Sequence, residues 1–180
     1  MAAIVKDNEL VEDAFTFAAT AESIPPEGPV LVPLELWQSR REPLLERKAP
    51  LGVQLRSDQS PETIAADLHL LEVVALEFPA FRDGRAYSYA RLLRERFGFA
   101  GEIRAVGDVL MEQLHFMLRT GFNAFAIKGE DPLAQFRAAL EDFSVWYQPT
   151  GDGRSTAIRT GIATATGTAS AADQNAKDRT

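Results

Sequence analysis

Short apolar runs and longer amphipathic segments alternate regularly between about residues 51 and 143. The apolar runs are typical of buried strands, and the segments after them have the apolar spacing of helices. The predicted strands are residues 51–56, 73–78, 102–107 and 124–127. The predicted helices are residues 60–71, 88–97, 108–121 and 131–147. Four consecutive strand–helix units predict right-handed crossovers and an α/β fold with a parallel sheet.

Capping residues stand at the boundaries of the predicted helices. Ser and Asp side chains accept hydrogen bonds from the free N–H groups of a first helical turn. The predicted N-cap residues are Ser60, Ser88, Asp108 and Asp131. Gly98 and Gly121 are the expected ends of the second and third helices, because glycine readily adopts the conformation that stops a helix.

Alternation within the strands separates an apolar face from a face of polar or small residues. The apolar face comprises Leu51, Val53, Leu55, Val74, Leu76, Phe78, Ile103, Ala105, Phe125 and Ile127. The opposite face comprises Gly52, Gln54, Arg56, Ala75, Glu77, Arg104, Asp108, Ala126 and Lys128. A doubly wound sheet is normally apolar on both faces, so the pattern favours half of a (βα)₈ barrel, with an open flavodoxin-like sheet as the alternative. The concave face of a half-barrel then needs a cover, either the first fifty residues, a second copy or a partner protein.

Composition divides the chain into three regions. Residues 28–149 are predicted to form one α/β domain, in which residues 29–37 are extended and Pro33 takes an edge position. Residues 1–27 form an N-terminal extension. Residues 150–180 are rich in Gly, Ala, Ser and Thr and contain no aromatic residue. Such a segment buries little apolar surface, so a disordered tail is predicted.

Charge and cysteine content narrow the possible functions. The net charge of −7 and the pI of about 4.9 argue against binding to a nucleic-acid backbone. The absence of cysteine excludes disulfides and cysteine-ligated centres within the chain. No apolar run approaches the roughly 20 residues that span a bilayer, and the first residues do not resemble a signal peptide. A cytoplasmic protein without a membrane partner is expected.

Six arginines lie between residues 82 and 104 of this acidic chain. In parallel α/β folds ligands bind where the strands end, and the loop after the second predicted strand contains Arg82 and Arg85 and leads to Ser88. A helix N-terminus beside two guanidinium groups is suited to an anion or an acidic partner, and Arg104 of the next strand is expected to converge with them. The competing interpretation is structural, with Asp83 holding the loop arginines.

The remaining arginines and titratable residues are explained by local pairing or packing, or give only a weak indication of a function. Arg104 would find a structural partner in Glu77 or Asp108, whereas Arg91, Arg94 and Arg96 are typical of a solvated helix face with local ion pairs. Asp83 and Asp108 are the candidate acid–base residues beside the arginines. His69 and His115 stand in apolar helical runs, which favours packed side chains, and no metal site is expected. No motif identifies a cofactor.

Residues 77–127 resemble a bacterial family catalogued as domain of unknown function 934. Its motif combines FP-x-F-x-DGR-x-(Y/F)-S-x-AR-x-LR with E-(I/L)-RA-x-GDV and R-x-GF segments. The matching residues are Phe78, Pro79, Phe81, Asp83, Gly84, Arg85, Ser88, Ala90, Arg91, Leu93, Arg94, Arg104, Ala105, Gly107, Asp108, Val109, Arg119, Gly121 and Phe122. Glu112 departs from the Asp common in the family, and the resemblance extends weakly over residues 28–143.

The resemblance implies a setting in sulfur metabolism. Family members resemble proteins labelled as probable oxidoreductases in sulfite reduction and are associated with assimilatory sulfite reductase. Three hypotheses follow. The chain is an accessory protein of sulfate and sulfite assimilation that acts with sulfite reductase through Arg82, Arg85 and Arg104. Alternatively, it is a small acid–base enzyme for an anionic substrate, or a module whose polar sheet face pairs with a second copy in a homodimer.

Overall fold

One curled sheet of eight strands forms the centre of the computed structural model, which describes residues 3–141. The strands are β1 (Ala3–Lys6), β2 (Glu9–Glu12), β3 (Thr16–Phe17), β4 (Val30–Pro33), β5 (Leu51–Leu55), β6 (Val73–Phe78), β7 (Glu102–Gly107) and β8 (Ala124–Phe125). Their order across the sheet is β2-β1-β8-β7-β6-β5-β4-β3. All pairs from β3 to β8 are parallel, and β1 runs antiparallel to both β8 and β2.

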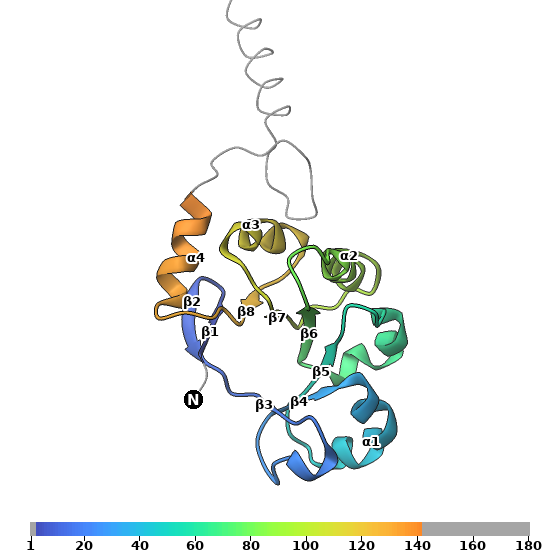
Figure 1. Cartoon of the computed structure of the whole chain (residues 1–180). Helices are drawn as coiled ribbons and strands as arrows, with labels where there is room; N and C mark the ends of the chain where they lie inside the picture. Colours follow the sequence, from blue (N-terminus) through green and yellow to red (C-terminus); the bar gives the residue numbers. More distant parts are fainter. Residues whose placement is uncertain (1–2, 142–180) are drawn as a thin grey trace, which may run out of the picture.

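Helices cover the convex side of this sheet, as Figure 1 shows. The helical segments are η1 (Ala21–Ser23), α1 (Leu34–Glu46), η2 (Pro61–Leu70), α2 (Arg85–Arg91), η3 (Leu92–Arg96), α3 (Met111–Thr120) and α4 (Pro132–Glu141). Of these, η2 is a 3₁₀ helix and η3 is a π-helical turn that continues α2. The strands form an arc with the helices outside it, which confirms the half-barrel-like α/β fold predicted from the four strand–helix units.

The predicted apolar face of the sheet is confirmed. All ten residues of the predicted apolar face belong to the main hydrophobic core. On the concave face, a second small cluster joins Leu31, Val73 and Ala75, and Phe15 packs against it. Gly52 lies between Leu31 and Val73 in register, and a Cβ at this position would stand 2.9 Å from Leu31 Cδ1. The concave side is therefore lined by small residues and closely packed.

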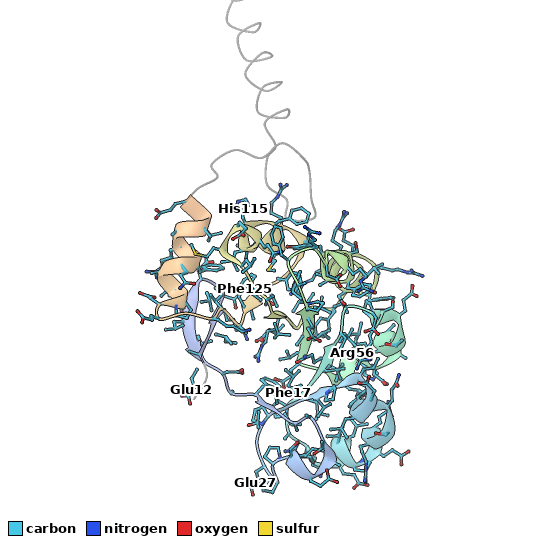
Figure 2. All side chains as sticks on the ribbon, in the orientation of Figure 1. Glu12, Phe17, Glu27, Arg56, His115 and Phe125 are labelled. Carbon is cyan, nitrogen blue, oxygen red and sulfur yellow. The ribbon has the colours of Figure 1, made fainter. Side chains whose placement is uncertain are left out.

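The first residues of the chain complete the sheet and cover its concave side. Strands β1 and β2 extend one edge, β3 extends the other, and only residues 13–15 connect the two edges. Figure 1 shows this link crossing the open side of the arc, and Figure 2 labels Glu12 and Phe17 at its two ends. Four residue steps span at most about 14 Å, so the edges are held near each other. Of the predicted covers, the N-terminal segment is the one observed.

Helix α1 is the longest of the elements that the sequence pattern missed, which also include β1, β2, β3 and η1. Residues 29–37 were predicted to be extended, but the strand ends at Pro33 and Leu34 begins a helix. Pro43 lies inside this helix, and Arg40 interrupts it with a φ of −131°, so no clean helical periodicity is visible. Strand β4 is also not an edge strand, although β3 pairs only with its first two residues and leaves Pro33 paired on one side.

Two predicted helix starts are wrong and two are confirmed. Helix α2 begins at Arg85, so Ser88 lies one turn inside it, and α3 begins at Met111 and not at Asp108. Ser60 Oγ accepts a hydrogen bond from the N–H of Glu62, and Asp131 Oδ1 accepts one from Ala134. Gly121, with a φ of +113°, ends α3 as predicted. The predicted tail at 150–180 and the last part of the predicted helix 131–147 lie outside the described residues.

Candidate partner- or anion-binding site

The loop between β6 and α2 is tied to the end of β5 by a charged hydrogen-bond network. Arg85 binds Asp83 with two bonds, Nε to Oδ1 at 3.0 Å and Nη2 to Oδ2 at 2.6 Å. Its Nη2 also donates to Ser57 Oγ at 2.9 Å, and its backbone N–H donates to Asp83 Oδ1. Tyr89 donates to the carbonyl oxygen of Ser57. Asp83 therefore orients Arg85 and closes the turn before the helix.

The same network controls the charge of Asp83. Hydrogen bonds from Arg85 and from Ser57 hold the pKa of the Asp83 carboxyl far below its ordinary value. Asp83 in turn raises the pKa of Arg85. Because Asp83 stays ionised and both of its oxygens accept hydrogen bonds from Arg85, it is poorly suited to donate or accept a proton at neutral pH.

Removing the guanidinium is expected to return Asp83 to ordinary titration. In wild type the pKa of Asp83 should lie well below 3.8, and in Arg85→Ala it should rise toward that value. A carboxyl with a depressed folded-state pKa stabilises the fold above its unfolded pKa, and this contribution is lost as the pH falls through the folded value. NMR titration of the Asp83 carboxyl carbon measures both variants. Equal pKa values in the two proteins would contradict the assigned network.

Arg104 does not join Arg82 and Arg85, which corrects the predicted convergence. It lies in the interior of β7 on the concave side, with only 3% of its side chain exposed. Its Nε donates to Glu102 at 2.6 Å, and its Nη1 donates to both oxygens of Asp13 at 2.9 and 3.0 Å. Phe15 lies against the guanidinium, and Lys6 pairs with Glu102 at 2.9 Å. Neither Glu77 nor Asp108 is its partner.

The helix arginines also divide into two kinds. Arg91 pairs with Glu95 at 3.1 Å and Arg96 pairs with Glu62 at 2.9 Å, as expected for a solvated face. Arg94 is instead half-buried and donates to three backbone carbonyl oxygens. These belong to Phe99 at 2.6 Å, Gly101 at 2.7 Å and Gly121 at 3.0 Å. Arg94 therefore fastens η3 to the segments before β7 and after α3.

The other predicted site residues are exposed. Among residues 3–141, Arg82 makes no hydrogen bond or ion pair. Ser88 lines a shallow hollow along α2 and η3, away from the β5–β6 network. Asp108 donates its backbone N–H to the carbonyl oxygen of Phe78 at 2.7 Å, and its carboxylate has no ion pair within the described part of the chain. His115 is buried as predicted, whereas His69 is exposed.

Three exposed apolar side chains lie in the loop that contains Arg82 and on the neighbouring helix α3, and sequence analysis did not identify them as functional. Phe81 is 54% exposed, Phe116 is 47% exposed and Met111 is 39% exposed. Gln113 of α3 donates to the carbonyl oxygen of Phe81, which places the loop beside α3. We call Phe81, Arg82, Met111 and Phe116 the edge patch. An apolar residue next to an arginine in a turn was the available signal, because turns are normally polar.

Aromatic packing supports this patch from below. The ring of Phe116 meets that of Tyr87 edge-on at 4.9 Å, and Tyr87 meets the buried Phe78 at 5.1 Å. Burial raises the pKa of Tyr87 to about 12, so its hydroxyl remains neutral. The exposed ring therefore stands on a rigid aromatic stack that continues into the core.

Comparison with known protein families identifies the family of this chain. The model of family DUF934, described as a bacterial protein of unknown function, matches residues 52–158, more than half of the chain. No curated protein matches the sequence of this chain. In the part of the chain that the structure describes, no three His, Cys, Asp or Glu side chains are grouped to hold a metal ion. Nor does any helix there have the length and apolar content to cross a membrane.

Proposed function

Since the chain belongs to DUF934, a family of bacterial proteins of unknown function, we propose that it is an accessory protein. It docks through the edge patch onto an acidic, partly apolar surface of a partner protein. The proposed partner is assimilatory sulfite reductase, because the sequence motif of this chain resembles that of proteins associated with this enzyme. The observation behind the docking function is that Phe81 and Arg82 are adjacent, exposed and supported by α3.

The composition of the edge patch is typical of protein interfaces. Aromatic residues, Met and Arg are enriched where binding energy is concentrated, whereas isolated charged residues are typical of ordinary surface. Arg82 is the cation available to a partner, because Arg85 is already bound by Asp83 and Ser57. In a chain of net charge −7, this local cation fits a carboxylate-bearing partner.

The two alternative functions lose support for separate reasons. Asp83, one of the two candidate acid–base residues, is held ionised by Arg85, which leaves Asp108 as the remaining candidate. Pairing of the polar sheet face with a second copy requires that this face be open. Asp13 and Phe15 occupy it and contact Arg104.

Binding to purified sulfite reductase tests the docking function. Phe81→Ser and Arg82→Glu should each raise the dissociation constant by at least about 30-fold, which corresponds to the roughly 2 kcal/mol of an interface hot spot. Isothermal titration calorimetry measures the affinities. Arg137→Glu is the matched control, because Arg137 on α4 is also exposed and makes no ion pair with a described residue.

Two results would contradict the proposal. Failure of the wild-type protein to bind sulfite reductase would exclude this enzyme as the partner. Equal affinities of wild type, Phe81→Ser, Arg82→Glu and Arg137→Glu would remove the edge patch as the docking surface.

A further inference from the structure

A second possible binding site lies between α1 and the proline-rich segment before β4. This pocket has a volume of about 320 Å³, within the range of small-molecule sites. Its walls are mostly apolar, and the apolar lining residues are Ala21, Ile24, Pro25, Pro26, Pro43 and Leu44. Figure 2 labels Glu27 on this segment, at the outer side of the molecule next to α1. The pocket is therefore separate from the edge patch.

One face of α1 supplies the floor of the pocket and both of its charges. Arg40, Pro43, Leu44 and Arg47 all line the pocket, from the interruption of α1 at Arg40 to the C-cap of the helix at Arg47. In sequence the two arginines flank the apolar lining residues Pro43 and Leu44. None of the residues that line the pocket is acidic.

Arg47 has hydrogen-bonding capacity that the described residues leave unused. Its Nη2 donates to the carbonyl oxygen of Gly28 at 3.0 Å, which directs the guanidinium across the helix end toward the proline-rich segment. Its Nε and Nη1 are buried and have no acceptor among the described residues. Buried donors without acceptors are rare because they lose their hydration without compensation. Each of these two N–H groups can donate a charged hydrogen bond to an oxyanion, and because they point in different directions they would not bind the same oxyanion together.

The second arginine adds positive potential without closing the pocket. Arg40 is exposed, and its charge lowers the pKa of Glu22 only as the weakest of several causes. Prolines on both sides of the pocket limit backbone motion, so little conformational entropy is lost when a ligand enters. The pocket thus combines a rigid apolar body with one cationic end at Arg47.

From this arrangement we propose that the pocket binds a small organic anion with a compact apolar body. The anionic head accepts a charged hydrogen bond from Arg47 after a small rotation of the guanidinium, and the apolar body lies against Pro43, Leu44 and Ile24. Carboxylates and sulfonates share the required head, so benzoate and benzenesulfonate are the two probes. This site neither depends on the docking function nor contributes to it.

Thermal unfolding and NMR of the full chain test the site. Benzoate, benzenesulfonate or both should raise the unfolding midpoint saturably, and should shift the Nε–H resonance of Arg47. Neutral benzamide and inorganic sulfate should give neither effect, because each lacks one half of the ligand. Stabilisation by benzamide or by sulfate equal to that by the aromatic anions would overturn the proposal.

Variants separate binding from folding. Arg47→Ala should weaken binding of the aromatic anion at least about tenfold, the effect of losing a charged hydrogen bond. Ala21→Phe keeps both arginines but fills the pocket, and it should abolish binding even if Arg47→Ala fails to fold. Arg137→Ala on α4 is the control and should bind like wild type. No saturable effect of either anion on wild type, or wild-type affinity in Ala21→Phe, would overturn the proposal.

Discussion

Arg104→Met is expected to lower the free energy of unfolding by about 3–5 kcal/mol, the largest effect of any change considered. The methionine keeps much of the apolar stem but removes the cation that Asp13 and Glu102 share. The side chains of these acids are only 15% and 6% exposed, so their charges would lose an ion partner where water cannot replace it. The link between the sheet edges would lose its anchor at the same time.

Urea denaturation followed by circular dichroism measures this loss. Arg82→Met is the matched control, because the same replacement at an exposed arginine without a described partner should change the free energy of unfolding by less than about 0.5 kcal/mol. Similar midpoints for the two variants would show that the buried network contributes no more than a surface charge.

Gly107→Ala should give the second-largest effect and lower the free energy of unfolding by about 3 kcal/mol. Gly107 ends β7 with a φ of +92°, and an added Cβ would collide with the backbone of Phe78. The carbonyl oxygen of Phe78 cannot easily move away, because it accepts the hydrogen bond from Asp108 at 2.7 Å. The substitution therefore combines an unfavourable backbone conformation with a steric clash.

Gly98→Ala separates the two causes. Gly98 also has a positive φ, +63°, but a Cβ there would meet nothing within 4 Å. Gly98→Ala should lower the free energy of unfolding by about 1 kcal/mol, which is the cost of the backbone conformation alone. Both variants are compared with wild type by urea denaturation. Equal losses at the two glycines would contradict the steric argument for Gly107.

The parts of the fold that sequence analysis predicted depend on local patterns. Strand alternation has a period of two, so residues such as Val74 and Leu76 could be assigned to the core face from neighbouring positions alone. Helix α1 could not, because Pro43 and the interruption at Arg40 conceal its periodicity, and burial of Trp37 in the core helps to hold it in place. Tertiary packing outweighs local propensity in this segment.

The candidate site shows the same contrast between local contacts, which the sequence predicts, and distant contacts, which it does not. The Asp83–Arg85 pair spans two residues and was among the interpretations that the sequence allowed. Of the two acidic partners of Arg104, Glu102 is only two residues away, but Asp13 could not be predicted because it is 91 residues away and belongs to a segment with no strong pattern. Arg94 was assigned to a solvated surface for a related reason. Three of its four acceptors are backbone carbonyl oxygens, and backbone acceptors leave no signature in side-chain identity.

The link at residues 13–15 also has a consequence for the order in which the chain folds during synthesis. Strand β1 pairs locally with β2, but its pairing with β8 and the contact of Asp13 with Arg104 can form only when most of the domain has been made. At the usual rate of translation this delay is roughly 10 s. Strands β4 to β7 can pair in order as they emerge. The link at residues 13–15 is therefore synthesised before the strands that it contacts, which makes closure of the half-barrel a late event in folding.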